Sequence, residues 1–216
     1  SMGRLMGRIT IDDVVDFIKE EADRDYQLQA GLSENVDSTD KVLVLSRARM
    51  PWLLVGLLGG LGSSALVSHF EPDLRHLPQM AFFMPVVAAM GGNAGVQSSA
   101  IIVQGLANNT LQSMNILPKL AKEFTVALLN GLICSAILLS WNIFIGHQNF
   151  DLSITVSLAL ITVIIFASVL GTLTPLVLEK FNIDPALATG PFISTTNDII
   201  GLTVYFSLGR LLLGSW

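Results

Sequence analysis

A single carboxylate lies in the middle of the last long apolar stretch of the sequence, which runs from Asp184 to Trp216. This residue, Asp198, would cost roughly 2.5–3.5 kcal/mol at mid-membrane depth, so a carboxylate there normally faces a bundle interior or a water-filled path. Ser194 precedes it by four residues, Gly190 by eight, and Gly201 follows after three. One helix face with a carboxylate, a hydroxyl and missing side chains suits a hard, hydrated cation such as Mg²⁺. The alternative is a structural aspartate that is hydrogen-bonded to Thr or Asn on a neighbouring helix.

A second unusual stretch, Pro85 to Ser99, reads PVVAAMGGNAGVQSS. Its glycines permit either a break in the helix or a very close helix approach, and its amides share one helix face. Non-helical backbone at membrane depth is tolerated where it lines a cavity. The alternative is a tight helix crossing with amide cross-links. The residues concerned are Gly91, Gly92, Asn93, Gly95 and Gln97.

The composition indicates a membrane protein. Hydrophobic residues make up 51% of the 216 residues and charged residues only 13%, where a soluble domain would carry about 25%. The mean hydropathy is +0.62. The net charge of −5 gives no nucleic-acid signal, because proteins that bind nucleic acid show basic patches.

The apolar runs predict an all-α, polytopic fold with five membrane-spanning helices. Each run approaches or exceeds the roughly 20 residues needed to cross a bilayer, and the longer ones must tilt or extend beyond it. The first holds a G-x-x-x-G pair, Gly56 and Gly60, which is a weak packing signal by itself. The predicted spans are Pro51 to Ser68, Gln79 to Ala107, Leu120 to Gly146, Leu152 to Leu178, and the stretch that ends at Trp216.

An acidic, amphipathic helix is predicted before the membrane part, from Ile11 to Leu32. Thr10 can cap its start, and Gly31 can stop it. The polar run from Ser33 to Asp40 then reads as a linker. Clustered carboxylates on this helix favour a divalent cation, although a solvated helix face is the ordinary interpretation of such a run. The carboxylates are Asp13, Asp16, Glu20, Glu21, Asp23 and Asp25.

Positive charges in the loops predict the orientation. Six lie on the side of the N-terminus and two on the other side, so we expect the N-terminus in the cytoplasm and the C-terminus outside. The six are Lys41, Arg47, Arg49, Lys119, Lys122 and Lys180, and the two are Arg75 and Arg210.

No catalytic motif accompanies these features, so we do not expect an enzyme. The sequence contains no G-x-S-x-G, Walker or H-E-x-x-H pattern. Its three histidines, His69, His76 and His147, are not spaced as a metal site.

The combined motifs are similar to those of the MgtE family of magnesium channels. The resemblance rests on the run from Pro85 to Ser98, on Asp184-Pro-Ala, and on Gly190-Pro-Phe followed by Asp198. It covers the five predicted spans and also residues 7–32. It implies that residues 1–16 are the end of a CBS domain, that 17–49 form a connecting "plug" helix and linker, and that 50–216 form the pore domain.

The family resemblance also implies a homodimer in the plasma membrane with one pore on its two-fold axis. Asp198 matches the acidic pore residue that holds hydrated Mg²⁺, and Asp184 matches the acidic residue at the cytoplasmic mouth. Asp13, Asp16, Glu21 and Asp25 match carboxylates that bind regulatory Mg²⁺, whereas Arg24 departs from that acidic pattern. The second and fifth helices would line the pore, with Leu187, Gly190, Ser194, Gly91, Gly92, Asn93 and Gly95 on the lining.

Two other functions stay open at this point. A cation-coupled carrier would need inward-facing and outward-facing states, usually built from internal repeats, and the five spans show no obvious repeat. A membrane anchor without transport activity would have no need for the polar face around Asp198.

Overall fold

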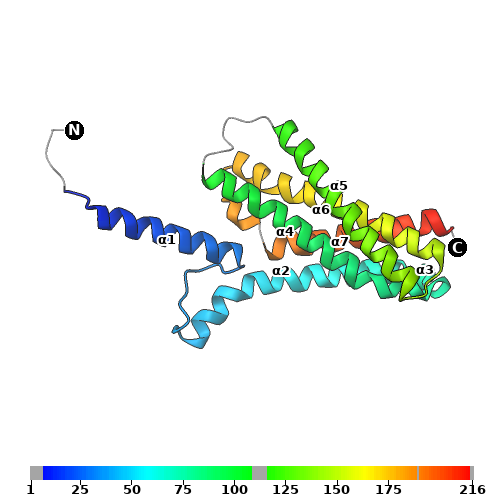
Figure 1. The fold of residues 1–216 in the computed structure, drawn as a ribbon. Coiled ribbons are helices and arrows are strands. Elements are labelled where there is room, and N and C mark those ends of the chain that lie inside the picture. Colours follow the sequence, from blue (N-terminus) through cyan, green and yellow to red (C-terminus); the bar gives the residue numbers. More distant parts are fainter. Residues whose placement is uncertain (1–6, 109–115, 189, 215–216) are drawn as a thin grey trace.

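The protein is a helical bundle with one helix projecting from it (Figure 1). The structure is a computed structural model, and it describes residues 7–108, 116–188 and 190–214. These residues contain helices and no strand, as the sequence predicts. The elements are α1 (Ile11–Gln29), α2 (Val42–His69), α3 (Glu71–His76), η1 (Pro78–Phe83), α4 (Met84–Ala107), α5 (Ile116–Phe144), α6 (Phe150–Lys180), η2 (Pro185–Ala188) and α7 (Pro191–Leu213).

The projecting helix α1 begins and ends close to the predicted residues. Thr10 caps it in a reciprocal capping box with Asp13, whose carboxylate accepts hydrogen bonds from the Thr10 backbone N–H (2.8 Å) and hydroxyl (2.6 Å). The helix ends at Gln29, three residues before the predicted Leu32, because Gly31 turns the chain with a φ of +80°. The α1 helix continues unbroken across residue 16, so the predicted boundary between residues 16 and 17 falls inside it.

Four helices are long and apolar enough to cross a membrane: α2, the continuous segment of η1 and α4, then α5, and α6. The protein is therefore a multi-pass membrane protein. The fifth predicted span, α7, has 23 residues, but Asn197, Asp198 and Arg210 interrupt its apolar sequence, and it is not among the four. Its crossing of the membrane stays a prediction.

Both α2 and α5 begin several residues earlier than predicted. The helix α2 begins at Val42, nine residues before the predicted Pro51, because a helix can continue past the bilayer into charged sequence. The helix α5 begins at Ile116, four residues before the predicted Leu120. Residues 109–115 lie outside the described residues, as do Ser215 and Trp216.

The glycine-rich stretch forms an unbroken helix, so of the two alternatives that its glycines permit the structure shows close helix approach and not a break. Pro85 lies in the first turn of α4, where a missing N–H costs nothing, and α4 then continues through Gly91, Gly92 and Gly95. The glycines instead allow close approach. A β-carbon at Gly171 of α6 would collide with the backbone of Gly95, so the two helix backbones touch at this pair.

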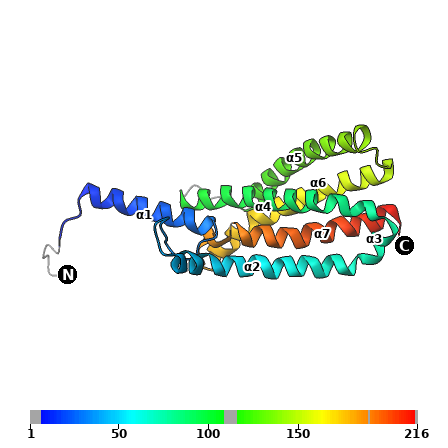
Figure 2. The same ribbon diagram turned by 90° about the horizontal axis from the view of Figure 1, so that it is seen from below.

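The helix α7 lies between α2 on one side and α4 and α6 on the other (Figure 2). At the end of the bundle that includes α3, a buried aromatic core holds these helices together. Phe70 and Phe206 stack there with ring centroids 4.8 Å apart, and the Tyr205 hydroxyl donates to the Met80 carbonyl oxygen at 2.8 Å. The position and rotation of α7 are thereby fixed by contacts with three helices.

We expect Arg210→Gln to lower the melting temperature by several degrees. The Arg210 guanidinium donates two hydrogen bonds to the buried Asp73 carboxylate, at 2.7 and 3.2 Å, and it also lies 5.3 Å from the centre of the Phe70 ring. The substitution leaves Asp73 buried without its cation, which is the costly way to break such a pair. Thermal unfolding of the purified protein measures the effect.

Arg75→Gln is the matched control. Arg75 pairs with Glu71 at 2.7 Å one turn away, but both side chains are more than half exposed, and exposed pairs contribute little. Equal melting temperatures for the two variants would contradict a structural role for Arg210.

Candidate cation site

One face of α7 and one face of α4 enclose a cleft of about 490 Å³ that contains Asp198. Ser194 and Asp198 face it together, one helical turn apart, as the sequence predicts. The small Gly92 and the amides of Asn93 and Gln97 lie opposite them on α4. The remaining lining residues are Ala88, Ala89 and Val96. The cleft is therefore polar at its centre although both helices are apolar overall.

The neighbouring face of α7, about 100° around the helix, explains why Asp198 faces the cleft. Ile193, Asn197 and Gly201 are buried against α4 and α6. A β-carbon at Gly95 would collide with the Asn197 side chain, so this glycine lets α7 lie flat against α4. Burial of Asn197 then places the next residue, Asp198, at the edge of the helix contact.

Several residues grouped by sequence with Asp198 point elsewhere. Gly91 and Gly95 are buried against Val163 and Asn197, so their α-carbons face the bundle interior. Gly201 also packs toward Val163. Thr195, beside Ser194 in the sequence, packs against Gly59 of α2. A helix of 3.6 residues per turn separates these neighbours onto different faces.

The half-buried Asp198 carboxylate has space around it. A β-carbon at Gly92 would lie 3.5 Å from the Ser194 hydroxyl oxygen and 3.7 Å from Asp198 Oδ1, so any side chain there would reduce this space. Among the described residues, none donates a hydrogen bond to the Asp198 carboxylate. One carboxylate, one hydroxyl and amide oxygens are hard ligands, and they suit a cation that keeps part of its water shell.

The residues just before α7 lie outside the lining of the cleft and next to the end of α1. Gly190 is the N-cap of α7 with a φ of +62°, so it lies before the helix and not on the face that was counted back from Asp198. A β-carbon there would lie 2.7 Å from the Gln29 carbonyl oxygen, which places the end of α1 against the start of α7. Leu187 is half-buried in η2, and Asp184 is exposed just before it.

The acidic residues of α1 fall into two sets: Asp16, Glu20 and Asp23 line one groove, whereas Asp13, Glu21 and Asp25 lie outside it. Asp13 serves as the capping partner of Thr10, and those hydrogen bonds lower the pKa of its carboxyl. Asp16 lines a groove of about 500 Å³ that includes Asp37 and Asp40 of the linker. Within the described ranges, no three or more His, Cys, Asp or Glu side chains are placed to hold a metal ion.

Asp25 is the α1 carboxylate whose pKa responds to Asp184, the residue just before η2. Burial raises its pKa above 3.8, and the carboxylates of Asp184 and then Glu21 raise it further, while Arg24 lowers it. The folded state therefore binds this proton more tightly than the unfolded state. The stability that Asp25 contributes is full below the unfolded pKa and is lost as the pH rises through the raised folded pKa.

We expect Asp184→Asn to lower the pKa of Asp25 toward 3.8 without reaching it, since the burial remains. A titration that follows the ¹³C shift of the Asp25 carboxyl measures the change. Asp12→Asn is the control, because Asp12 is not among the groups that shift this pKa. An unchanged pKa in Asp184→Asn would show that the two carboxylates do not interact.

A second cavity with polar residues in its lining, of about 390 Å³, lies on the other side of α4 and is not predicted from the sequence. Glu123 of α5 faces it, and the Ser98 hydroxyl of α4 lies 2.5 Å from a Glu123 carboxylate oxygen. Asn93 and Gln97 line both this cavity and the cleft of Asp198. The rule for carboxylates inside predicted spans could have singled out Glu123, which lies three residues into the predicted third span.

Comparisons with known proteins agree with these features. The MgtE family model, described as a divalent cation transporter, matches residues 84–208. A protein named magnesium transporter MgtE from Bacillus subtilis is 35% identical over 98% of this chain and 47% of its own length. Proteins of the same name from Thermus thermophilus (35% identical; 98% and 47%) and Enterococcus faecalis (30%; 96% and 45%) also match. The chain spans about half the length of these curated relatives.

Proposed function

Because this chain belongs to the MgtE family of divalent cation transporters, we propose that it transports Mg²⁺ through a cation-selective channel formed by two copies of the chain. Asp198 is the residue that attracts the ion. Ser194 and Asn93 contribute oxygen ligands or hold its waters. The chain is a transport protein and not an enzyme.

The observation that carries this proposal is the environment of Asp198. Its carboxylate lies in a cleft between α4 and α7 with room for water and with no hydrogen-bond donor from the rest of the described chain. A single carboxylate is a poor site for Mg²⁺, which takes six oxygen ligands. A second copy across a two-fold axis supplies a second Asp198 and closes the cleft into a pore.

The proposed channel lies in the plasma membrane with the α1 side in the cytoplasm. Lys41, Lys119 and Lys180 flank helix ends on that side, and Arg75 and Arg210 lie near the other end. This distribution fits the preference of positive loops for the cytoplasm. The C-terminus then lies outside.

Regulatory Mg²⁺ at α1 is part of the proposal. In this scheme residues 1–16 are the end of a CBS domain, 17–49 the connecting helix and linker, and 50–216 the pore domain. The contact of α1 with η2 and with Gly190 supports it, because movement of α1 is thereby linked to the start of α7. A cation at Asp25 and Asp184 would relieve their repulsion and hold α1 at the mouth.

Purified protein in liposomes tests the function. We expect Mg²⁺ influx along its gradient, followed with an entrapped Mg²⁺-sensitive dye, and discrete single-channel currents in planar bilayers. Flux without resolvable currents, and dependent on a coupled ion, would identify a carrier instead. The complete absence of flux would favour a membrane anchor.

Native mass spectrometry and crosslinking in membranes test the assembly. We expect a dimer under conditions that preserve flux. A strictly monomeric species that still conducts Mg²⁺ would contradict the pore on a two-fold axis while leaving the transport activity itself intact.

A further inference from the structure

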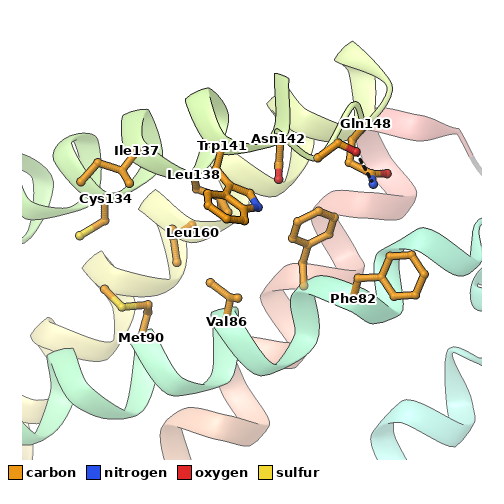
Figure 3. Close-up of a pocket in the computed structure, with 12 residues that line it drawn as sticks. Phe82, Val86, Met90, Cys134, Ile137, Leu138, Trp141, Asn142, Gln148 and Leu160 are labelled. Carbon is orange, nitrogen blue, oxygen red and sulfur yellow. Dashed lines mark hydrogen bonds between the residues drawn. The ribbon is translucent and has the colours of Figure 1, made fainter. Parts of the chain in front are cut away.

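An apolar cavity of about 580 Å³ lies between α4 and α5, near the turn that joins α5 to α6 (Figure 3). It exists because α5 packs on α6 and barely contacts α4, so a space opens between these two membrane helices. Its volume falls in the range of about 300–1,000 Å³ that is typical of ligand sites. Residues that line it include Phe82, Val86, Met90, Cys134, Ile137 and Leu138.

One polar group among these apolar walls has no partner. Asn142 of α5 is 1% exposed, and its amide nitrogen Nδ2 has no hydrogen-bond partner among the described residues. Figure 3 shows this side chain among the cavity residues, whereas the nearby Gln148 amide donates to the Gly146 carbonyl oxygen at 3.1 Å. A buried donor without an acceptor costs about 1–3 kcal/mol. The ligand that relieves this cost must carry an acceptor oxygen beside an apolar body.

The position of Asn142 along α5 narrows the choice of ligand. It lies two residues before the end of the helix at Phe144, and Trp141 is adjacent and also lines the cavity. Tryptophan is enriched where a membrane helix reaches the headgroup level. The ester carbonyls of a phospholipid lie at this same boundary, directly above the acyl chains.

We propose that this cavity binds one acyl chain of a phospholipid, and that an ester carbonyl oxygen of the lipid accepts a hydrogen bond from Asn142 Nδ2. The bilayer supplies this ligand next to the opening between α4 and α5. Water is a poor occupant, because it needs two to four polar partners and the cavity walls offer few. An empty cavity would lose the dispersion contacts of its lining residues.

Lipid retention in native mass spectrometry tests the proposal. The full chain is purified in a mild detergent from liposomes of diacyl phosphatidylcholine, and the lipids that remain bound are counted. We expect at least one retained lipid per protomer, and at least threefold fewer for Ile137→Trp, which fills the cavity. Leu129→Trp is the matched control, since Leu129 is a similarly exposed residue of α5 (59%, against 66% for Ile137) outside the cavity.

Asn142→Leu tests the hydrogen bond separately. Replacing an unpartnered amide by an apolar side chain of similar size preserves the fold. An ether-linked analogue of the lipid lacks the carbonyl acceptor, so we expect the parent protein to retain it less well than the ester-linked lipid. We expect Asn142→Leu to retain the ester-linked lipid only as weakly as the parent protein retains the ether-linked one. Equal retention of both lipids by the parent protein would overturn the role of Asn142.

Two further outcomes would overturn the site itself. One is that Ile137→Trp and Leu129→Trp retain equal numbers of lipid molecules and that a lipid with a photoreactive acyl chain crosslinks evenly along α5. The other is protection of Cys134 from maleimide by dimerisation in lipid-free detergent, which would identify a second copy of the chain as the occupant. Lipid that protects Cys134 in the monomer supports the proposal.

Discussion

Replacing Asp198 by asparagine is expected to lower Mg²⁺ flux by about tenfold or more and to weaken selectivity for Mg²⁺ over monovalent ions. At an effective dielectric constant of about 20, two unit charges 4 Å apart attract by about 4 kcal/mol. The substitution removes that attraction and keeps the side-chain shape, so the Gly92 side of the cleft is unchanged. Reversal potentials in mixed Mg²⁺ and K⁺ solutions measure the selectivity.

Asp151→Asn is the matched control for this prediction. It makes the same chemical change in the first turn of α6, at the other end of the bundle from α1 and outside the cleft. We expect its flux and reversal potential to equal those of the parent protein. If Asp198→Asn also equals the parent, Asp198 is not the selectivity residue, and it is a structural aspartate.

The second large effect is expected for Gly171→Ala, which should destabilise the protein by about 3 kcal/mol, at the upper end for an overpacked core. The new methyl group would collide with the Gly95 backbone of α4, and a backbone cannot move aside as a flexible side chain can. The contact between α4 and α6 must therefore widen. Chemical unfolding of the purified protein measures the change.

Gly60→Ala separates this collision from the general effect of replacing a membrane glycine. A β-carbon at Gly60 meets no atom of the described chain within 4 Å, and alanine is the better helix former. We expect unchanged or slightly higher protomer stability. Equal destabilisation by both substitutions would show that the close contact between α4 and α6 is not what Gly171 permits.

Asp198 and α1 show how much could be read from the sequence. The helical class, the four helices long and apolar enough to span a membrane and the capping of α1 by Thr10 follow from local sequence, because hydropathy and caps act over a few residues. Spacing of four residues correctly placed Ser194 and Asp198 on one face, since both lie on one uninterrupted helix. The family resemblance, which the comparisons confirm, rested on the same local motifs.

Other features depended on how the helices pack. Spacing alone could not tell that Gly95 faces Asn197 and the bundle interior while Gly92 faces the cleft, because the rotation of α4 is set by its contacts with α6 and α7. Gly190 does not lie on the helix face counted back from Asp198, because its positive φ places it before the first helical residue of α7. The turn that requires this φ packs against Gln29.

The cavities depended on tertiary structure alone. Glu123 and Ser98 are 25 residues apart and meet because α5 crosses near α4 at that level, while the same two helices separate around Asn142. Hydropathy predicts that each helix enters the membrane, and it carries no information on the angle between two helices. The angle between α4 and α5 depends on how the side chains of α5 pack against α6. The local sequences of α4 and α5 do not encode that packing.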